Sequence, residues 1–174
     1  MRKTFWLLSI ILLGFFSCNS HKESNRHDSE MVDSFLISRY DSIYTFPDIM
    51  EKRFVQEQKG LTDSVSFYRL ELFRAFCRFL QGDTRDAMRT NDRVLAYARS
   101  HDDTDALEAV CWNHRYAMLQ GMNQRDSAVA CLHHAYDALY RATDRRELEN
   151  VCINLADQYR QMGDQPNAAR YYRK

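Results

Sequence analysis

Three short stretches recur along the chain at nearly constant spacing, and this repeat constrains the fold more than any other feature. They are QGDTRDAMRT around Ala87, MNQRDSAVAC around Ala128 and MGDQPNAARY around Ala168, so that the alanines lie 41 and 40 residues apart. Five residues before each alanine stands a residue type that tolerates the left-handed backbone with which many helices end. These residues are Gly82, Asn123 and Gly163. A period of this length indicates stacked units of one local structure.

Each recurring stretch carries signals for the end of one helix and the start of the next. Asp83 and Asp164 stand where an N-cap is needed, and Pro166 falls in the first helical turn, where its missing N–H does no harm. Farther upstream in the units, the segments that begin at Asp105 and Asp144 both read D-x-x-E, the form of a capping box, and lie 39 residues apart. Each unit is therefore predicted to be a helical hairpin.

The last unit resembles a tetratricopeptide repeat (TPR), in which a small residue early in the second helix lets two antiparallel helices approach closely. The stretch NLADQYRQMGDQPNAARYY matches the family pattern at Leu155, Ala156, Tyr159, Gly163, Ala168 and Tyr172. The middle unit matches at Trp112, Leu119, Ala128, Leu132 and Ala135. Arg115 and Tyr116 depart from the pattern. The resemblance implies an all-α fold, a TPR-like α-solenoid of antiparallel helix hairpins.

The repeat and the composition divide the chain into six segments. They are a signal peptide (1–18), a tether (19–30), an N-terminal helical hairpin (31–60), and TPR-like repeats at 64–103, 104–143 and 144–174. The hairpin at 31–60 is either a degenerate repeat or a cap, and Pro47 marks the break between its two helices. Because the last repeat is incomplete and has no cap, we expect the natural chain to continue beyond Lys174.

The N-terminus reads as an export signal. Arg2 and Lys3 precede an apolar run of about a dozen residues, which suits a signal peptide and falls short of the roughly 20 residues that span a bilayer. Ser17 directly before Cys18 resembles the bacterial lipobox, although the two preceding phenylalanines depart from it. Lipidation at Cys18 would anchor the protein to a membrane of the bacterial cell envelope, facing the periplasm. Ordinary secretion is the alternative. The next twelve residues, NSHKESNRHDSE, are all polar and predict a flexible tether.

Nothing in the sequence indicates catalysis or a cofactor. It contains no Gly-rich nucleotide loop, no H-E-x-x-H and no G-x-S-x-G. His133 and His134 are adjacent, so on a helix they diverge by about 100° and do not form a metal site by themselves. The 24 basic residues balance 24 acidic ones without a basic stripe, which argues against nucleic-acid binding. The cysteines Cys77, Cys111, Cys131 and Cys152 sit in apolar helical stretches and predict buried free thiols rather than disulfides.

The TPR resemblance implies a concave groove lined by the first helix of each hairpin. Carried over residue by residue, it predicts groove positions at Asn113, Ala117, Gln120, Asn150, Ile153, Asp157 and Arg160. In the first repeat the corresponding positions are Phe73 and Cys77. Asn113 and Asn154 are able to bond a ligand backbone, since an amide both donates and accepts. The alternatives are that Asn154 supports helix packing and that Asp157 and Arg160 pair with neighbours.

The resemblance therefore implies a non-enzymatic scaffold for a protein or peptide ligand, with homo-oligomers allowed. The composition is similar to that of the N-terminal halves of bacterial TPR regulators, which continue into a membrane span and a histidine kinase or helix-turn-helix output domain. A lipid anchor and a later membrane span would be two anchors, so these two expectations compete. The alternative is a stand-alone envelope lipoprotein that acts in assembly or as an adaptor.

Overall fold

The computed structural model describes residues 4–142 and 147–174, with side chains from residue 23 onward. The described residues form eight helices and no strand, which confirms the all-α prediction. The helices are α1 (Thr4–Thr45), α2 (Pro47–Gln58), α3 (Ser64–Leu80), α4 (Thr84–Ser100), α5 (Asp105–Gly121), α6 (Arg125–Arg141), α7 (Leu148–Gln161) and α8 (Gln165–Tyr172). No helix in this part of the chain is both long and apolar enough to cross a membrane.

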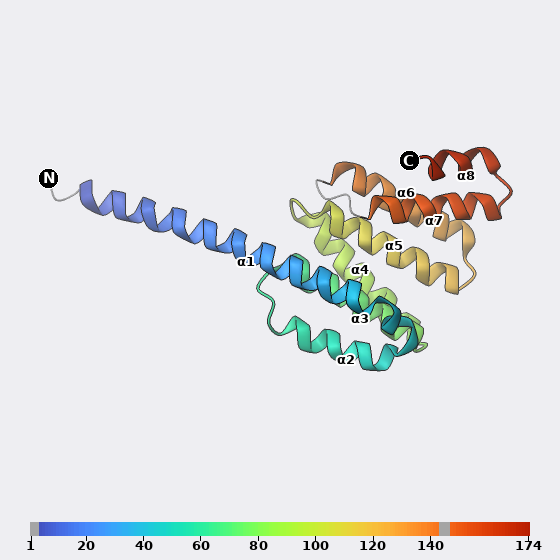
Figure 1. Ribbon diagram of the computed structural model, residues 1–174, viewed down its shortest axis with the longest axis horizontal. Helices are drawn as coiled ribbons and strands as arrows, with labels where there is room; N and C mark the ends of the chain where they lie inside the picture. Colours follow the sequence, from blue (N-terminus) through green and yellow to red (C-terminus); the bar gives the residue numbers. More distant parts are fainter. Residues whose placement is uncertain (1–3, 143–146) are drawn as a thin grey trace.

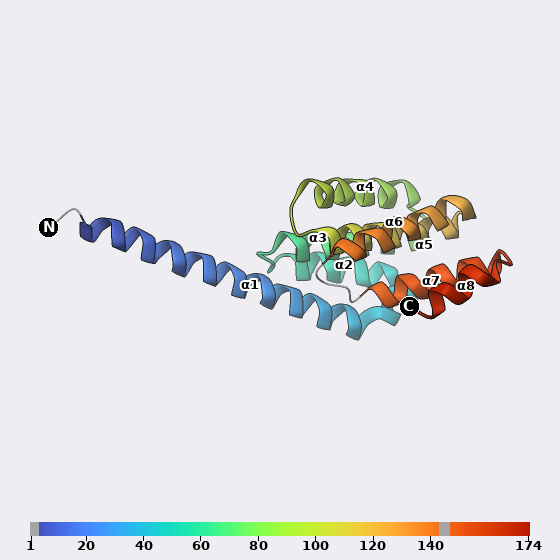
Figure 2. The same cartoon turned by 90° about the horizontal axis from the view of Figure 1, so that it is seen from above.

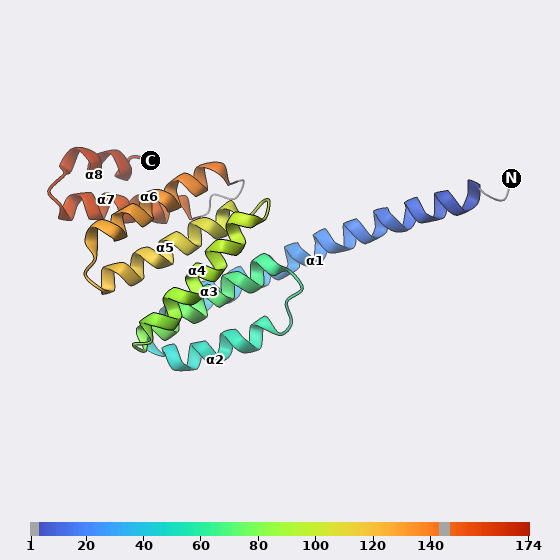
Figure 3. The same ribbon diagram turned by 180° about the vertical axis from the view of Figure 1, so that it is seen from behind.

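The helices pack in the order in which they follow one another in the chain. The pairs α1–α2, α3–α4, α5–α6 and α7–α8 form antiparallel hairpins, while α2 packs on α3, α4 on α5, and α6 on α7. The hairpins follow one another from α2 at one end of the body to α8 at the other, and the first part of α1 extends away from it (Figures 1 and 3). This arrangement is the predicted solenoid of helix hairpins.

Left-handed residues end the first helix of each of the last three hairpins, as the sequence predicts. Gly82, Asn123 and Gly163 have φ angles of 96°, 63° and 81°. The two glycines adopt this conformation without the steric cost that a Cβ atom brings, and asparagine is among the residues that tolerate it best. These residues turn the chain back so that each second helix packs against its first.

Two of the predicted N-caps are confirmed and one is wrong. The side chains of Asp83 and Asp164 accept hydrogen bonds from the backbone N–H groups three residues on, and both act as N-caps. Asp105 does not cap its unit, because it is the first residue of α5 and Thr104 takes the cap position without a side-chain cap bond. Asp144 lies outside the described residues.

The small residues of the repeat are buried where helices approach. Ala87, Ala128 and Ala168 are at most 1% exposed, so a larger side chain has no room there. The other predicted packing residues Leu132, Leu155 and Ala156 are fully buried, whereas Trp112 and Tyr159 are partly buried against the same core.

The prediction that Tyr172 packs in the repeat is wrong. Its side chain is 51% exposed, whereas the neighbouring Tyr171 is 7% exposed and stacks on Tyr159 with ring centroids 5.8 Å apart. The helix α8 turns its face with Ala168 and Tyr171, three residues apart, toward α7. Tyr172 follows by about 100° around the helix and points away.

The segment predicted to be a flexible tether, 19–30, lies within α1. Asp28 is 5% exposed, and its carboxylate accepts hydrogen bonds from the backbone N–H groups of Thr62 (2.7 Å) and Asp63 (2.8 Å) and from the Thr62 hydroxyl (2.9 Å). Burial by itself would raise the pKa of Asp28, but these bonds hold it below its usual value. A polar segment is thus ordered by hydrogen bonds to the turn before α3, a contact that composition does not reveal.

Candidate functional site

A groove of about 720 Å³ runs along the odd-numbered helices. All of its described lining residues belong to α1, α3, α5 or α7, or to Glu147 directly before α7. Figure 2 shows α4 on one side of the body and α1 and α7 on the opposite side. The groove therefore has α1 and α7 as walls and α3 and α5 as its floor.

The α1 wall carries large apolar side chains that remain exposed. Ile37, Tyr40 and Tyr44 are spaced by three and four residues, so they share one helix face. They are 81%, 54% and 52% exposed, and all three line the groove. From the α7 wall, Ile153 adds a side chain that is 42% exposed. The two walls thus present apolar surface to the space between them.

Part of the groove floor is made of rings. His114 of α5 lies edge to face with Phe73 at a centroid distance of 4.6 Å, and tilted against Phe76 at 5.5 Å. Its Nδ1 atom is buried and has no hydrogen-bond partner among the described residues. Burial lowers the pKa of His114 to about 4, so the ring is neutral near pH 7. Phe73 in turn contacts Phe54 of α2, which ties the floor to the first hairpin.

Two asparagines, one on the α5 floor and one on the α7 wall, form a polar part of the groove. The Nδ2 atom of Asn154 in α7 donates to the Oδ1 atom of Asn113 in α5 over 3.2 Å. Asn113 Nδ2 and Asn154 Oδ1 have no hydrogen-bond partner among the described residues, and both asparagines line the groove. The pair therefore offers one donor group and one acceptor, the same combination that a peptide group presents.

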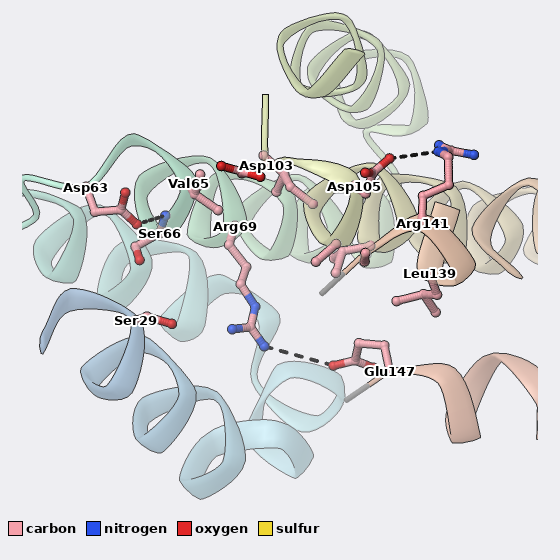
Figure 4. Close-up of a pocket in the computed structure, with 14 residues that line it drawn as sticks. Ser29, Asp63, Val65, Ser66, Arg69, Asp103, Asp105, Leu139, Arg141 and Glu147 are labelled. Atoms are coloured by element: carbon pink, nitrogen blue, oxygen red, sulfur yellow. Dashed lines mark hydrogen bonds and ion pairs between the residues drawn. The ribbon is translucent and has the colours of Figure 1, made fainter. Parts of the chain in front are cut away.

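Charged side chains gather at one end of the groove. Arg69 is hydrogen-bonded to Asp33 of α1, and its Nη2 atom is 3.9 Å from Oε1 of Glu147. Figure 4 shows Arg69 reaching from α3 toward Glu147. Arg69, Glu147 and Val110 line both the groove and a smaller pocket of about 200 Å³ beyond it. The ion pair thus separates the groove from this second pocket.

Four of the seven groove positions predicted from the sequence line the groove, namely Asn113, Ala117, Asn150 and Ile153, and Phe73 does so as well. Gln120, Asp157 and Arg160 do not, because they lie nearer the C-terminal ends of α5 and α7 than the lining residues do. Asp157 instead accepts hydrogen bonds from Arg160 (3.2 Å) and from the Tyr172 hydroxyl (2.5 Å). Cys77 is fully buried and does not line it.

The α1 wall is the part of the site that sequence reasoning missed. Buried Val32, Leu36 and Ile43 mark the face of α1 that docks on the body, and Ile37 and Tyr40 lie on a second apolar face. A helix with apolar residues on two faces is a signal for two contacts. This pattern is present in the sequence, but it does not indicate which element the second face of α1 lies opposite.

The remaining chemistry-bearing side chains have structural partners. His133 Nε2 lies 2.9 Å from the Tyr159 hydroxyl, and the His134 ring lies against Trp112 at a centroid distance of 4.6 Å. Within residues 23–142 and 147–174 no three His, Cys, Asp or Glu side chains gather as a metal site would require. The thiols of Cys77, Cys111, Cys131 and Cys152 are free and buried. Burial raises the pKa of Cys77 to about 12, which keeps it unreactive near pH 7.

Comparisons with known proteins yield no relative for this chain. No family model, no curated protein and no solved structure matches it. The geometry and chemistry of the groove are therefore the basis on which function is inferred.

Proposed function

We propose that this chain is a non-enzymatic, TPR-type scaffold that binds a peptide or protein segment in its groove. One observation carries the proposal. Exposed apolar side chains on two facing helices, represented by Ile37 and Ile153, line a groove that also holds an open amide donor and acceptor. Monomeric proteins seldom leave a concentrated apolar surface open to water unless something binds there, and the volume lies in the range of ligand sites.

The side chains of the groove suit recognition better than catalysis. His114 is neutral, and its Nδ1 atom is buried away from the open space. Arg69 is held by Asp33 and Glu147 at the end of the groove. Among the described residues, the lining contains no serine or cysteine beside a base, the arrangement that nucleophilic catalysis needs. Amides and apolar surface in a concave site are the usual means of holding a peptide.

The cellular setting that we propose follows from the predicted signal peptide at residues 1–18. We infer an exported protein, anchored through a lipid on Cys18 in the bacterial envelope, whose array is the interaction part of a longer signalling protein with a kinase or helix-turn-helix output. Replacement Cys18→Ser should then release the chain from membranes into the soluble fraction, measured by fractionation of expressing cells. Unchanged partitioning would leave an export signal without a lipid.

Peptide binding can be tested without knowing the natural ligand. A displayed library of random seven-residue peptides is selected on the purified full chain, and enriched sequences are then measured against two variants. Ile153→Arg places a charge on the groove wall, whereas Met162→Arg alters a more exposed apolar residue (58% exposed) outside it. We expect the enriched peptides to lose binding to Ile153→Arg and to keep it with Met162→Arg. No enrichment, or equal binding to both variants, would contradict the proposal.

A further inference from the structure

We propose that the occupant of the groove is an extended peptide segment of about five uncharged residues that carries an aromatic side chain. This inference rests on the proposed function and adds the chemistry of the ligand. It follows from three properties of the groove: the rings on its α1 side, the position of its charges and its length.

The rings on the α1 side form a row that is open at one end. Tyr40 and Tyr44 lie 5.5 Å apart between centroids at 61°, and Tyr44 meets Phe76 at 5.8 Å and 76°. Both contacts have the edge-to-face arrangement that aromatic pairs prefer. Tyr40 and Tyr44 remain about half exposed beside the groove. A ligand ring placed against them continues the row, and it gains more there than an aliphatic side chain of similar size does.

Charge complementarity excludes charged ligand side chains from the part of the groove that Leu36 to Tyr44 of α1 line. The charged lining residues are Asp33, Arg69 and Glu147, all at one end and engaged with one another. The other lining residues lie on α1 from Leu36 to Tyr44, on α3 and α5, and along α7. Their side chains are apolar, aromatic or amide, and His114 is neutral. A charged side chain bound there would lose water without meeting an opposite charge, which is costly.

The length of the groove and its amides favour an extended backbone. On α1 the lining runs from Asp33 to Tyr44, which at 1.5 Å per residue is about 16 Å. An extended chain covers this distance with about five residues. Such a chain has unpaired N–H and C=O groups that can bond to Asn154 Oδ1 and Asn113 Nδ2. A helical ligand satisfies its own backbone and would leave both amide groups without a partner.

The test uses blocked five-residue peptides with alanine at four positions and Phe, Leu, Ala or Asp in the centre, titrated into the purified full chain by calorimetry. We expect the Phe peptide to bind roughly 2- to 10-fold more tightly than the Leu peptide, and the Ala and Asp peptides to bind at least roughly 10-fold more weakly than the Phe peptide. Methylating the backbone nitrogen of the central residue should weaken the Phe peptide by a similar factor.

Matched variants assign these differences to the groove. Tyr40→Ala should remove the preference for Phe over Leu. Tyr172→Ala, a tyrosine of similar exposure outside the groove, should keep it. Urea midpoints of both variants show that they remain folded. Equal binding of the Phe and Asp peptides, or no effect of backbone methylation, would overturn the inference.

Two further outcomes separate this inference from the proposed function. If library selection yields groove-dependent peptides that are charged or helical, the scaffold proposal stands and the extended, uncharged, aromatic ligand is wrong. If size-exclusion chromatography shows a dimer that Tyr40→Ala dissociates, a second copy of the chain fills the groove, and the inference is likewise wrong. If neither the library nor the Phe peptide binds, both proposals fail.

Discussion

Asn154 donates a hydrogen bond from Nδ2 to Oδ1 of Asn113 over 3.2 Å, although the two residues are 41 positions apart in the chain. One turn farther along, Gln158 Nε2 donates to the Tyr116 hydroxyl over 3.2 Å at a separation of 42. Both separations are close to the repeat period. Equivalent positions of neighbouring units therefore meet side by side, and the bonds fix the spacing of α5 and α7 where the floor of the groove meets its wall.

The first prediction concerns this asparagine pair. Asn113→Ala and Asn154→Ala should each destabilise the fold, and the double variant should cost less than the sum of the two. A coupling of about 0.5–1.5 kcal/mol is expected for a partly buried neutral hydrogen bond. Urea unfolding of the four proteins gives the coupling directly. Strict additivity would show that the two amides do not interact in solution.

The second prediction tests the packing of the repeat with two adjacent alanines. Ala168 is 1% exposed and Ala169 is exposed on the same helix. Ala168→Glu buries a carboxylate where there is neither room nor a partner, and should destabilise the array by at least about 3 kcal/mol. Ala169→Glu should change the stability by less than about 0.5 kcal/mol. Similar urea midpoints for both variants would contradict the register of α8.

The third prediction is a pH dependence of stability. The pKa of His114 falls from its ordinary 6.5 to about 4 in the folded chain, so the unfolded chain binds more protons between these values. Stability should therefore decrease as the pH falls from 6.5 to 4, by up to about 3 kcal/mol.

The variant His114→Phe isolates this effect. It replaces the titrating ring by an apolar one among the existing rings and should flatten this part of the profile. The measurement is the urea midpoint at several pH values. A profile that His114→Phe does not change would assign the dependence to other groups.

The fourth prediction concerns the docking of α1. Asp28→Ala leaves the backbone N–H groups of Thr62 and Asp63 without their acceptor, at a cost of about 1–3 kcal/mol. We expect faster hydrogen exchange at these two amides and at the neighbouring turns of α1. Glu30→Ala, two residues away and exposed, should leave the exchange unchanged. Equal exchange in both variants would show that the Asp28 contacts do not hold the helix.

The sequence by itself determined the hairpins. Gly82 and Gly163 end helices, Asp83 and Asp164 start them, and Ala128 and Ala168 are buried, because each of these features depends on residues a few positions apart. The repeat then implies stacking, since one hairpin cannot bury its apolar face alone. The prediction for Tyr172 failed because adjacent residues on a helix differ by about 100° in direction. A shift of one residue therefore exchanges an inward side chain for an outward one.

Only the tertiary structure decided which side chains line the groove. Whether α1 faces α7 depends on the crossing angles of every hairpin between them, which are set by side-chain packing and not by any local pattern. For the same reason the order of the polar segment around Asp28, and the partnership of Tyr40 with Phe76 through Tyr44, could not be predicted. The repeating units depend on local and periodic interactions, which short stretches of the sequence encode. The site instead depends on contacts between residues that lie far apart in the sequence.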